Sequence, residues 1–199
     1  PEPARVEYLW TGRGPLLSPV IIKDDVPFSL AWTIYEGGKT FEAVYRLNQA
    51  RNWEEFCRAL ELWDAPSQNF VYADTAGNIG YYLSGKIPLR EKTSALFPAP
   101  GWEENHQWQG YLAEAKKPNI FNPETGYVIT ANHNIAPKKY PYYIGCSFEA
   151  SFRAQRIEDL ILRQEKHSVE TFKKIQNDCF SKKAEFLLPF IRKVKADDK

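Results

Sequence analysis

Two apolar runs on either side of a tight turn constrain the fold more than any other part of the sequence. The first run is Asn69 to Ala73 and the second is Ile79 to Leu83. Between them stands Asp74-Thr75-Ala76-Gly77-Asn78, in which Gly77 can take a positive φ. Aromatic and β-branched residues favour extended backbone. These residues therefore predict an antiparallel β-hairpin.

Before the hairpin, the expected structure changes from strands to helices. Three runs are strand candidates, namely Ala4 to Trp10, Val20 to Ile22 and Phe28 to Ile34. Apolar residues with a helical period then predict two helices. The first carries Phe41, Val44, Tyr45 and Leu47 with Thr40 as a cap, and the second carries Trp53, Phe56, Cys57, Leu60 and Trp63 with Asn52 as a cap.

After the hairpin, the sequence predicts a long loop and one more strand. Residues 85–125 are rich in Gly, Pro and Trp. A loop of that length without regular structure suggests a functional surface. Gly126 to Ala131 is the predicted strand, and a polar turn follows it.

Three helices are expected in the last part of the chain. One has an apolar face from Phe152 to Ile161, one is capped by Ser168, and one contains Pro189, which should kink or divide it. The order strands, helices, hairpin, helices indicates an α+β fold rather than alternating βαβ units. Residues 1–38 are expected to be mostly β, 39–64 helical, 65–148 hairpin, loop and strand, and 149–199 helical.

Composition limits the classes of function. The 26 Lys and Arg against 25 Asp and Glu leave a net charge of +1, so no basic face indicates a nucleic-acid partner. No apolar run approaches the ~18 residues of a membrane span. Cys57, Cys146 and Cys179 are odd in number and form no CxxC, which predicts neither a disulfide framework nor a zinc site. Aromatic residues make up 15%, which suits a binding surface or a core of large rings.

Familiar reaction motifs do not occur in these residues. We find no GxGxxG, Walker loop, HExxH or GxSxG. The three histidines are His106, His133 and His167. Their spacing in the sequence is not that of metal ligands, so we predict no metal site from them. A self-contained enzyme with a familiar nucleophile or metal is therefore not visible.

Polar side chains stand at the ends of two predicted strands. Gln68 and Asn69 enter the hairpin, and Asn132-His133-Asn134 leave the strand that ends at Ala131. A side-chain amide that a strand holds still is a suitable donor to a developing oxyanion. The alternative is that Asn132 and Asn134 only tolerate left-handed turn geometry. Composition alone favours that alternative.

Arg153 and Arg156 open a predicted helix one turn apart. The guanidinium of Arg153 could anchor Asn132 or a substrate carboxylate. The alternative is a weak surface ion pair. Its partners would be Glu149, Glu158 or Asp159.

The aromatic loop suggests a second class of function. Trp102, His106 and Trp108 stand near Glu103 and Glu104. Stacked rings beside carboxylates could bind a sugar, and a carboxylate pair could cleave it. More often such rings anchor a loop to the core. A non-catalytic module that binds a sugar or peptide through residues 95–111 is therefore the main rival to an enzyme.

Four segments form an ordered set of motifs. They are APSQNFVYADTAGNIGYYLSGKIPLR at 65–90, FPAPGWEENHQWQGY at 97–111, NPETGYVITANHNIAPKKYP at 122–141 and SFRAQRIEDLI at 151–161. In this order and spacing they resemble the middle of the large chain of penicillin amidases and acyl-homoserine-lactone acylases. RNWEEF at 51–56 and TGRGP at 11–15 fit the same family. The resemblance covers almost the whole chain and weakens after about residue 180.

The resemblance implies part of an N-terminal-nucleophile hydrolase with an αββα-type architecture. In that family a precursor cuts itself, and the new N-terminal residue, usually Ser, attacks an amide carbonyl. Its own α-amine is the base, which is reasonable because an α-amino group titrates near ~7.7–8.0. Carried across, Asn132 matches the oxyanion-hole Asn and Arg153 matches the Arg that orients it. Gln68, beside Asn69, falls at the acyl pocket, where a polar residue argues against a phenylacetyl preference.

The resemblance also implies partners, namely a small-molecule amide substrate and the remainder of the same precursor. The balanced charge, by contrast, argues against a nucleic-acid partner. The chain begins at Pro1 and has no Met, so we expect a processed or incomplete chain whose nucleophile lies elsewhere. By itself it should be inactive. A family member that keeps the fold and has lost catalysis is a third possibility.

No cofactor is expected. Relatives bind calcium partly through an Asp shortly after a tyrosine-proline step, but Tyr140-Pro141 is followed by Tyr142-Tyr143-Ile144-Gly145. Calcium needs several oxygen ligands, and this segment has no carboxylate. The sequence does not determine the compartment, although the resemblance favours a periplasmic or extracellular protein.

Overall fold

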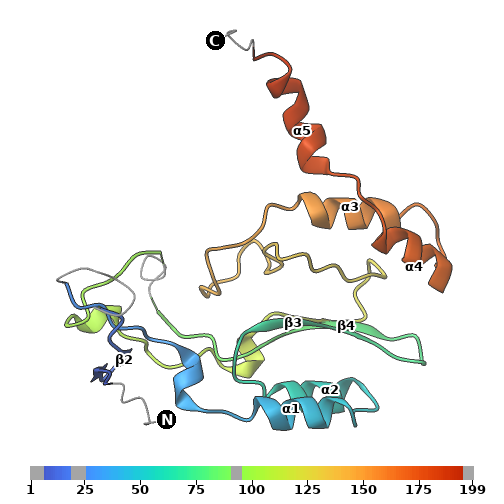
Figure 1. Ribbon diagram of the computed structural model, residues 1–199. Coiled ribbons are helices and arrows are strands. Elements are labelled where there is room, and N and C mark those ends of the chain that lie inside the picture. Colours follow the sequence, from blue (N-terminus) through green and yellow to red (C-terminus); the bar gives the residue numbers. More distant parts are fainter. Residues whose placement is uncertain (1–6, 19–25, 91–95, 195–199) are drawn as a thin grey trace, which may run out of the picture. The chain divides into compact units, whose positions relative to one another are not determined.

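The computed structural model describes residues 7–18, 26–90 and 96–194, and its contacts divide the chain into two units. Unit 1 comprises residues 1–126 and 138–146, and unit 2 comprises residues 127–137 and 147–199. Both helices and small sheets are present (Figure 1), which confirms the predicted α+β class. The strand predicted at Val20 to Ile22 and residues 4–6 of the first predicted strand lie outside the described residues.

The predicted hairpin is the centre of unit 1. Strand β3 (Gln68–Ala73) pairs antiparallel with β4 (Ile79–Ser84), and Ala73 stands opposite Ile79 across the turn. Figure 1 shows the two strands side by side along their length. A third strand, β5 (Asn119–Phe121), pairs antiparallel with β4. The hairpin prediction is confirmed with each strand one residue longer than expected.

Asp74 organises the hairpin turn. Its carboxylate accepts hydrogen bonds from the backbone N–H groups of Ala76 and Asn78, both at 2.9 Å, and from the side chains of Asn78 and Tyr72, both at 2.8 Å. These bonds, led by that from the Asn78 side chain, hold the pKa of Asp74 below its usual value. Gly77 has φ 86°, a conformation that glycine adopts without steric cost.

Two short helices precede the hairpin, as predicted. They are α1 (Thr40–Leu47) and α2 (Trp53–Leu60). Asn52 caps α2 by accepting the Glu55 N–H at 2.9 Å, so that cap is confirmed. The prediction that Thr40 caps α1 is wrong. Its hydroxyl instead accepts the Asp64 N–H at 3.1 Å and ties α1 to the segment after α2.

Aromatic rings form the contact between α2 and one face of the sheet. Trp53 stacks on Phe56 of its own helix at 5.5 Å and on Phe121 of β5 at 5.0 Å. Tyr72 of β3 meets Trp53 edge-on at 5.4 Å. Leu60 is fully buried, and its carbonyl accepts the Ser84 hydroxyl at 2.8 Å. A core of large rings, one of the two uses expected from the aromatic content, is therefore present.

The first part of unit 1 contains less strand than the sequence predicts. Strands β1 (Trp10–Thr11) and β2 (Gly14–Pro15) are short. The predicted strand from Phe28 to Ile34 is present only at its start, where Ser29 forms an antiparallel bridge with Leu16, and a 3-10 helix, η1 (Thr33–Glu36), replaces its end. The tighter turn brings Trp32 to 5.6 Å from Tyr35. That contact is the physical reason for the difference.

The long loop is more regular than predicted. It contains two 3-10 turns, η3 (Glu104–His106) and η4 (Glu114–Lys116), as well as β5. Tyr82 of β4 donates to Glu114 at 3.0 Å, and Glu114 also pairs with the buried Lys117. These contacts tie the loop to the sheet. Strand β5 has three residues, too few for an alternation of apolar and polar residues to reveal it in the sequence.

Unit 2 contains the three predicted helices, α3 (Phe152–Ile161), α4 (Val169–Gln176) and α5 (Lys182–Ile191). Ser168 caps α4 by accepting the Thr171 N–H, as expected. Helix α5 runs through Pro189 as one element, so the prediction of a division there is wrong. The strand predicted from Gly126 to Ala131 is also wrong, because these residues pair with no strand in the described part of the chain.

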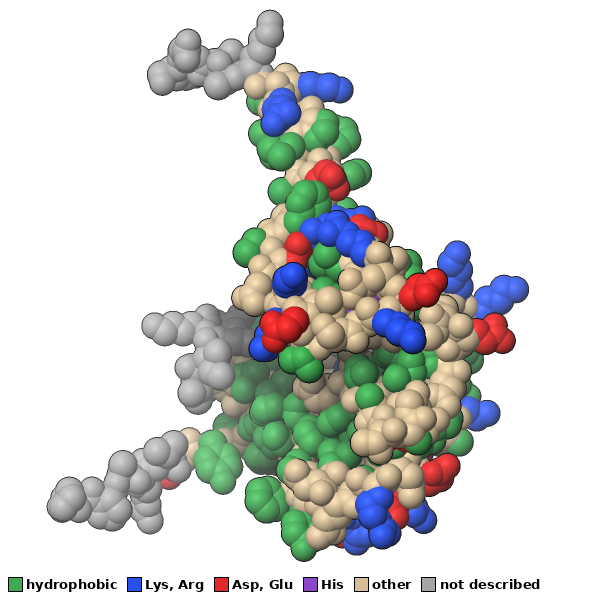
Figure 2. All heavy atoms as spheres, turned by 90° about the vertical axis from the view of Figure 1, so that its right-hand side faces the viewer, with side chains coloured by type: hydrophobic (Ala, Val, Ile, Leu, Met, Phe, Trp, Pro, Cys, Tyr) green, Lys and Arg blue, Asp and Glu red, His purple; other side chains and the backbone are tan. Residues whose placement is uncertain are grey.

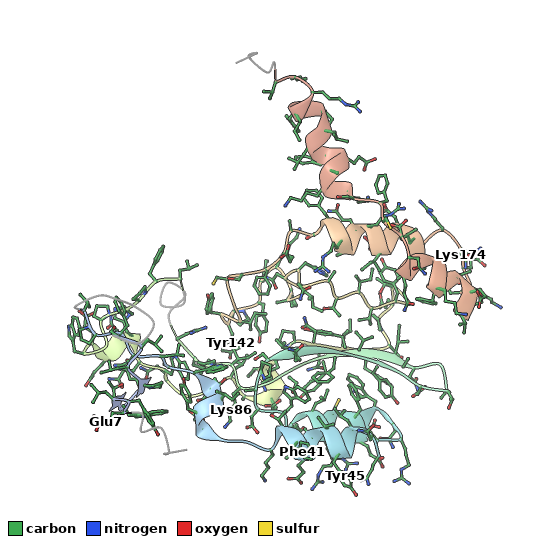
Figure 3. The ribbon with its side chains drawn as sticks, viewed as in Figure 1. Glu7, Phe41, Tyr45, Lys86, Tyr142 and Lys174 are labelled. Carbon is green, nitrogen blue, oxygen red and sulfur yellow. The ribbon has the colours of Figure 1, made fainter. Side chains whose placement is uncertain are left out.

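Large apolar side chains remain exposed on α5 and α1. Figure 2 shows hydrophobic side chains along α5, where Phe190 is 57% exposed and Ile191 60%. On α1, Phe41 is 90% exposed and Tyr45 64%; both are labelled in Figure 3. In the part of the chain that the structure describes, no helix has the length and apolar character needed to cross a membrane.

Candidate functional site

Asn132 and Arg153 meet in unit 2. The Arg153 Nη2 group donates to the Asn132 side-chain oxygen at 2.5 Å and to the Ala131 carbonyl at 2.8 Å. The Asn132 carbonyl accepts the Glu149 N–H at 2.8 Å. Ala131 is buried, whereas Asn132 and Arg153 are exposed. Arg153 at the start of α3 therefore holds the side chain of Asn132, and Glu149, just before that helix, holds its backbone.

The chemistry of arginine decides which way the Asn132 amide points. A guanidinium has N–H donors and no acceptor, so the amide atom that faces Arg153 must be the oxygen. The NH₂ group of Asn132 is then directed away from Arg153. Within the described residues it has no hydrogen-bond partner. This arrangement leaves two oriented donors available to an external oxygen atom.

The backbone of Asn132 also has a turn conformation, with φ 60°. Asparagine tolerates that conformation better than most residues. Asn134 has a purely local role, because its side-chain oxygen accepts the Ala136 N–H at 3.0 Å in an Asx turn. Turn formation thus accounts for both the backbone and the side chain of Asn134. For Asn132 it accounts only for the backbone conformation.

Arg156, one turn further along α3, makes an ion pair with Asp178. Its Nε and Nη2 atoms donate to the two carboxylate oxygens at 2.9 and 2.6 Å. The guanidinium also lies over the Phe180 ring, 4.5 Å from its centroid. The hydrogen bonds from Arg156 hold the pKa of Asp178 below its usual value. An ion-pair role fits Arg156, but its partner is none of the three acidic residues proposed from sequence.

Gln68 and Asn69 belong to unit 1 and point to opposite faces of the sheet, since side chains alternate along a strand. Gln68 shares its face with Phe70 and Tyr72, which contact α2. Asn69 shares its face with Tyr81, whose hydroxyl donates to the Asn69 side-chain oxygen at 2.6 Å. Both residues are exposed. The two side chains therefore cannot line the same wall of one pocket.

Unit 1 also contains a cavity of about 580 Å³, and part of residues 95–111, the segment that the sequence suggested as a binding surface, lines it. Its lining includes Trp10, Trp32, Tyr35, Trp108, Arg13 and Arg90. None of the four sequence-predicted site residues lines it. Trp108 of the aromatic loop does, whereas Trp102 is 85% exposed. Arg13 lies in the TGRGP motif, and that motif is the signal that could have drawn attention to it.

Among the described residues, no three His, Cys, Asp or Glu side chains lie close enough together to bind a metal ion. Near Tyr140-Pro141, the Arg90 guanidinium lies 5.8 Å from the Tyr143 ring centroid. A cation and neutral phenols do not fit calcium, which requires several oxygen ligands and usually carboxylates.

Comparison with known families shows one match over the whole chain. The family model described as penicillin amidase matches residues 1–199. Among curated proteins, the chain is 29% identical over 187 residues to acyl-homoserine lactone acylase QuiP of Pseudomonas fluorescens, which is 92% of this chain and 23% of that protein. It is 37% identical over 118 residues to penicillin G acylase of Escherichia coli, which is 57% of this chain and 13% of that protein.

A solved structure resembles the chain as well. Thermostable penicillin G acylase from Alcaligenes faecalis matches with a TM-score of 0.68 and 25% identity, over 96% of this chain and 35% of that chain. Another similar protein, of Pseudomonas sp., is named penicillin acylase 2 proenzyme, and the chain spans 18% of its length. The chain thus spans about a fifth of the length of the curated relatives that it matches.

Proposed function

This chain belongs to the penicillin amidase family, and on that premise we propose that the protein that carries it hydrolyses a carboxylic amide. In this proposal the chain supplies Asn132 as an oxyanion-hole residue and Arg153 as the residue that orients it. The nucleophile, an N-terminal Ser exposed when a precursor cuts itself, comes from another part of the protein.

The contact between Arg153 and Asn132 carries the proposal. An oxyanion hole needs donors that are already aimed when charge develops, because reorientation during the reaction would cost free energy. Arg153 occupies the oxygen of the Asn132 amide and so directs its NH₂ group outward. The left-handed backbone and the bond from Glu149 hold the Asn132 main chain. A residue whose only role was to form a turn would not need the guanidinium.

The proposed reaction has two steps. The N-terminal Ser hydroxyl attacks the amide carbonyl while its α-amine takes the hydroxyl proton. The carbonyl oxygen becomes negative and accepts an N–H from Asn132. Collapse of this intermediate expels the amine, which takes the proton, and leaves an acyl-enzyme. Water then releases the acid by the same route.

Gln68 and Asn69 are the proposed substrate-binding residues of this chain. Because their side chains alternate in direction, each would contact a different part of a bound substrate. The Tyr81 hydroxyl fixes the orientation of the Asn69 amide by occupying its oxygen. Relatives are named for penicillin and for acyl-homoserine lactone. A polar residue at 68 favours a substrate other than a phenylacetyl amide.

Calcium has no role in the proposed mechanism. The segment after Tyr140-Pro141 presents phenols and a guanidinium to its surroundings. Those groups do not replace the carboxylates that calcium prefers. The proposed partners are a small-molecule amide and the remainder of the precursor, and no nucleic acid is included.

Intact-mass measurement with N-terminal sequencing tests the nucleophile. The protein is expressed from its full gene, and its chains are separated under denaturing conditions. We expect a chain that contains these 199 residues and begins with Ser. A single uncut chain, or a processed chain that begins at Pro1, would remove the nucleophile and favour a binding module or a family member without catalysis.

A further inference from the structure

The cavity of unit 1 is built from aromatic rings whose positions fix one another. Trp10 meets Tyr35 edge-on with ring centroids 5.1 Å apart, and Trp32 meets the same ring at 5.6 Å. Trp10 and Trp32 nevertheless remain 56% and 49% exposed. Trp108 adds a further ring from the long loop. The cavity therefore presents apolar ring surface that the other described residues leave exposed.

Two arginines line the same cavity. They are Arg13 and Arg90, both partly buried, and the Arg90 guanidinium also lies 5.8 Å from the Tyr143 ring centroid. Among the described residues neither makes an ion pair with a carboxylate, and the Nε of Arg90 is buried there without a hydrogen-bond partner. A partly buried cation without a counter-charge is costly. An anionic ligand would remove that cost.

One carboxylate also lines the cavity, that of Glu36, but it is already engaged. It accepts a hydrogen bond from the Tyr111 hydroxyl and lies 3.3 Å from Lys86 Nζ. Lys86, labelled in Figure 3, also lies 3.2 Å from Asp64. Glu36 and Asp64 therefore share the single positive charge of Lys86, and the Tyr111 contact attaches η1 to the loop. Among the described residues that line the cavity, two arginines stand against this single carboxylate, so the lining keeps an excess of positive charge.

We propose that this cavity is a binding site for a planar aromatic carboxylate, separate from the amide-hydrolysing site. The rings of Trp10, Trp32 and Trp108 would contact the aromatic part of the ligand. Arg13 and Arg90 would together hold the carboxylate, since guanidinium N–H donors match the geometry of its two oxygens. The volume of about 580 Å³ is in the usual range for small-molecule sites.

Equilibrium dialysis of the whole protein against benzoate tests this site. Benzamide has the same ring without the charge, and cyclohexanecarboxylate has the charge without the aromatic ring. We expect benzoate to bind, and both analogues to bind at least tenfold more weakly. Arg13→Gln and Arg90→Gln should each raise the Kd for benzoate by about tenfold or more, because a hydrogen bond to a charged group is lost. Arg13→Lys should recover part of the affinity.

Arg51→Gln is the matched control. Arg51 is 82% exposed on its side chain and pairs with Glu55 in α2, so this variant should bind benzoate like the parent protein. Asn132→Gly should also keep benzoate binding. Loss of binding in Asn132→Gly would place benzoate at the amide site and overturn the inference.

Three other results would also overturn the inference. The first is that benzoate does not bind, and the second is that benzoate and benzamide bind with equal affinity. The third is that the arginine variants keep their melting temperature and bind benzoate as the parent protein does. If amide hydrolysis is absent while benzoate binding depends on the two arginines, the proposed function fails and the second site stands.

Discussion

At the scale of single residues, two neighbouring asparagines have different roles. Asn134 uses its side chain locally, for the backbone of Ala136. The side-chain oxygen of Asn132 is held by Arg153 instead, 21 residues further along the chain. Both residues are asparagines in a polar segment whose composition is typical of a turn. Only the partner of the side chain separates a residue that shapes a turn from one that presents donors.

Replacing Asn132 tests its role without straining the backbone. Asn132→Gly keeps the left-handed φ of 60° accessible and removes the amide. We expect kcat for amide hydrolysis to fall by about 10²–10³, the usual effect of removing one oxyanion donor. Steady-state kinetics on the processed protein measures this. Asn134→Ala is the control and should retain most of its kcat, while unchanged kcat in Asn132→Gly would refute the assigned role.

At the scale of elements, close packing joins the hairpin to α2. Gly80 of β4 lies against the Trp53 ring, and an added Cβ would stand 2.5 Å from Trp53 Cζ3. Trp53 cannot easily move, because Phe56 and Phe121 stack on it. A glycine inside a strand usually weakens it. Here it allows the helix to approach the sheet.

Gly80→Ala should therefore destabilise the protein. Overpacking of this kind typically costs about 1–3 kcal/mol, so the melting temperature should fall by several degrees. Differential scanning calorimetry of the processed protein measures the change. Gly12→Ala is a suitable control, since an added Cβ there meets no atom within 4 Å. Equal melting temperatures for the two variants would show that Trp53 does not limit the space at residue 80.

The ion pair between α3 and the residues after α4 should make stability depend on pH. Arg156 lowers the pKa of Asp178 in the folded state. The pair therefore contributes its full stability above the unfolded pKa of about 3.9 and loses it as the pH falls through the lower, folded pKa. Between about pH 6 and about pH 3, Asp178→Asn should lose less melting temperature than the parent protein.

Glu170→Gln provides the control for that comparison. Glu170 pairs with Lys173 on the surface, with side chains 73% and 60% exposed. Exposed pairs contribute little. The pH dependence of this variant should match that of the parent protein. The same acid sensitivity in Asp178→Asn would mean that other carboxylates account for it.

At the scale of the whole molecule, the chain shares its family's fold. It matches the family over residues 1–199 but spans about a fifth of its curated relatives. The proposed oxyanion residues lie in unit 2 and the proposed binding residues in unit 1. The proposed nucleophile is in neither. The proposed chemistry therefore requires a nucleophile from another part of the protein.

The isolated 199-residue chain should show no amide hydrolysis. Asn132 and Arg153 can stabilise charge, but covalent catalysis needs an activated nucleophile. A continuous assay with a chromogenic acyl amide, at high concentrations of the purified chain, measures this. The processed protein at the same molar concentration is the positive control. Turnover by the isolated chain that exceeds a mock purification would contradict the division of roles.

The sequence alone determined those features that depend on neighbouring residues. The hairpin, the helices α1 to α5, and the caps at Asn52 and Ser168 follow from short-range periods and side-chain-to-backbone bonds. The ordered motifs also indicated the family, and with it Asn132 and Arg153 as candidate residues. These inferences need no knowledge of distant contacts.

Only the tertiary structure decided features that depend on residues far apart in the chain. Thr40 bonds to the segment after α2 instead of capping α1, and Gly126 to Ala131 finds no strand partner among the described residues. The cavity joins Arg13 to Arg90, which lie on separate segments of unit 1. Such contacts arise when packing brings distant surfaces together, and no local pattern encodes which surfaces will meet.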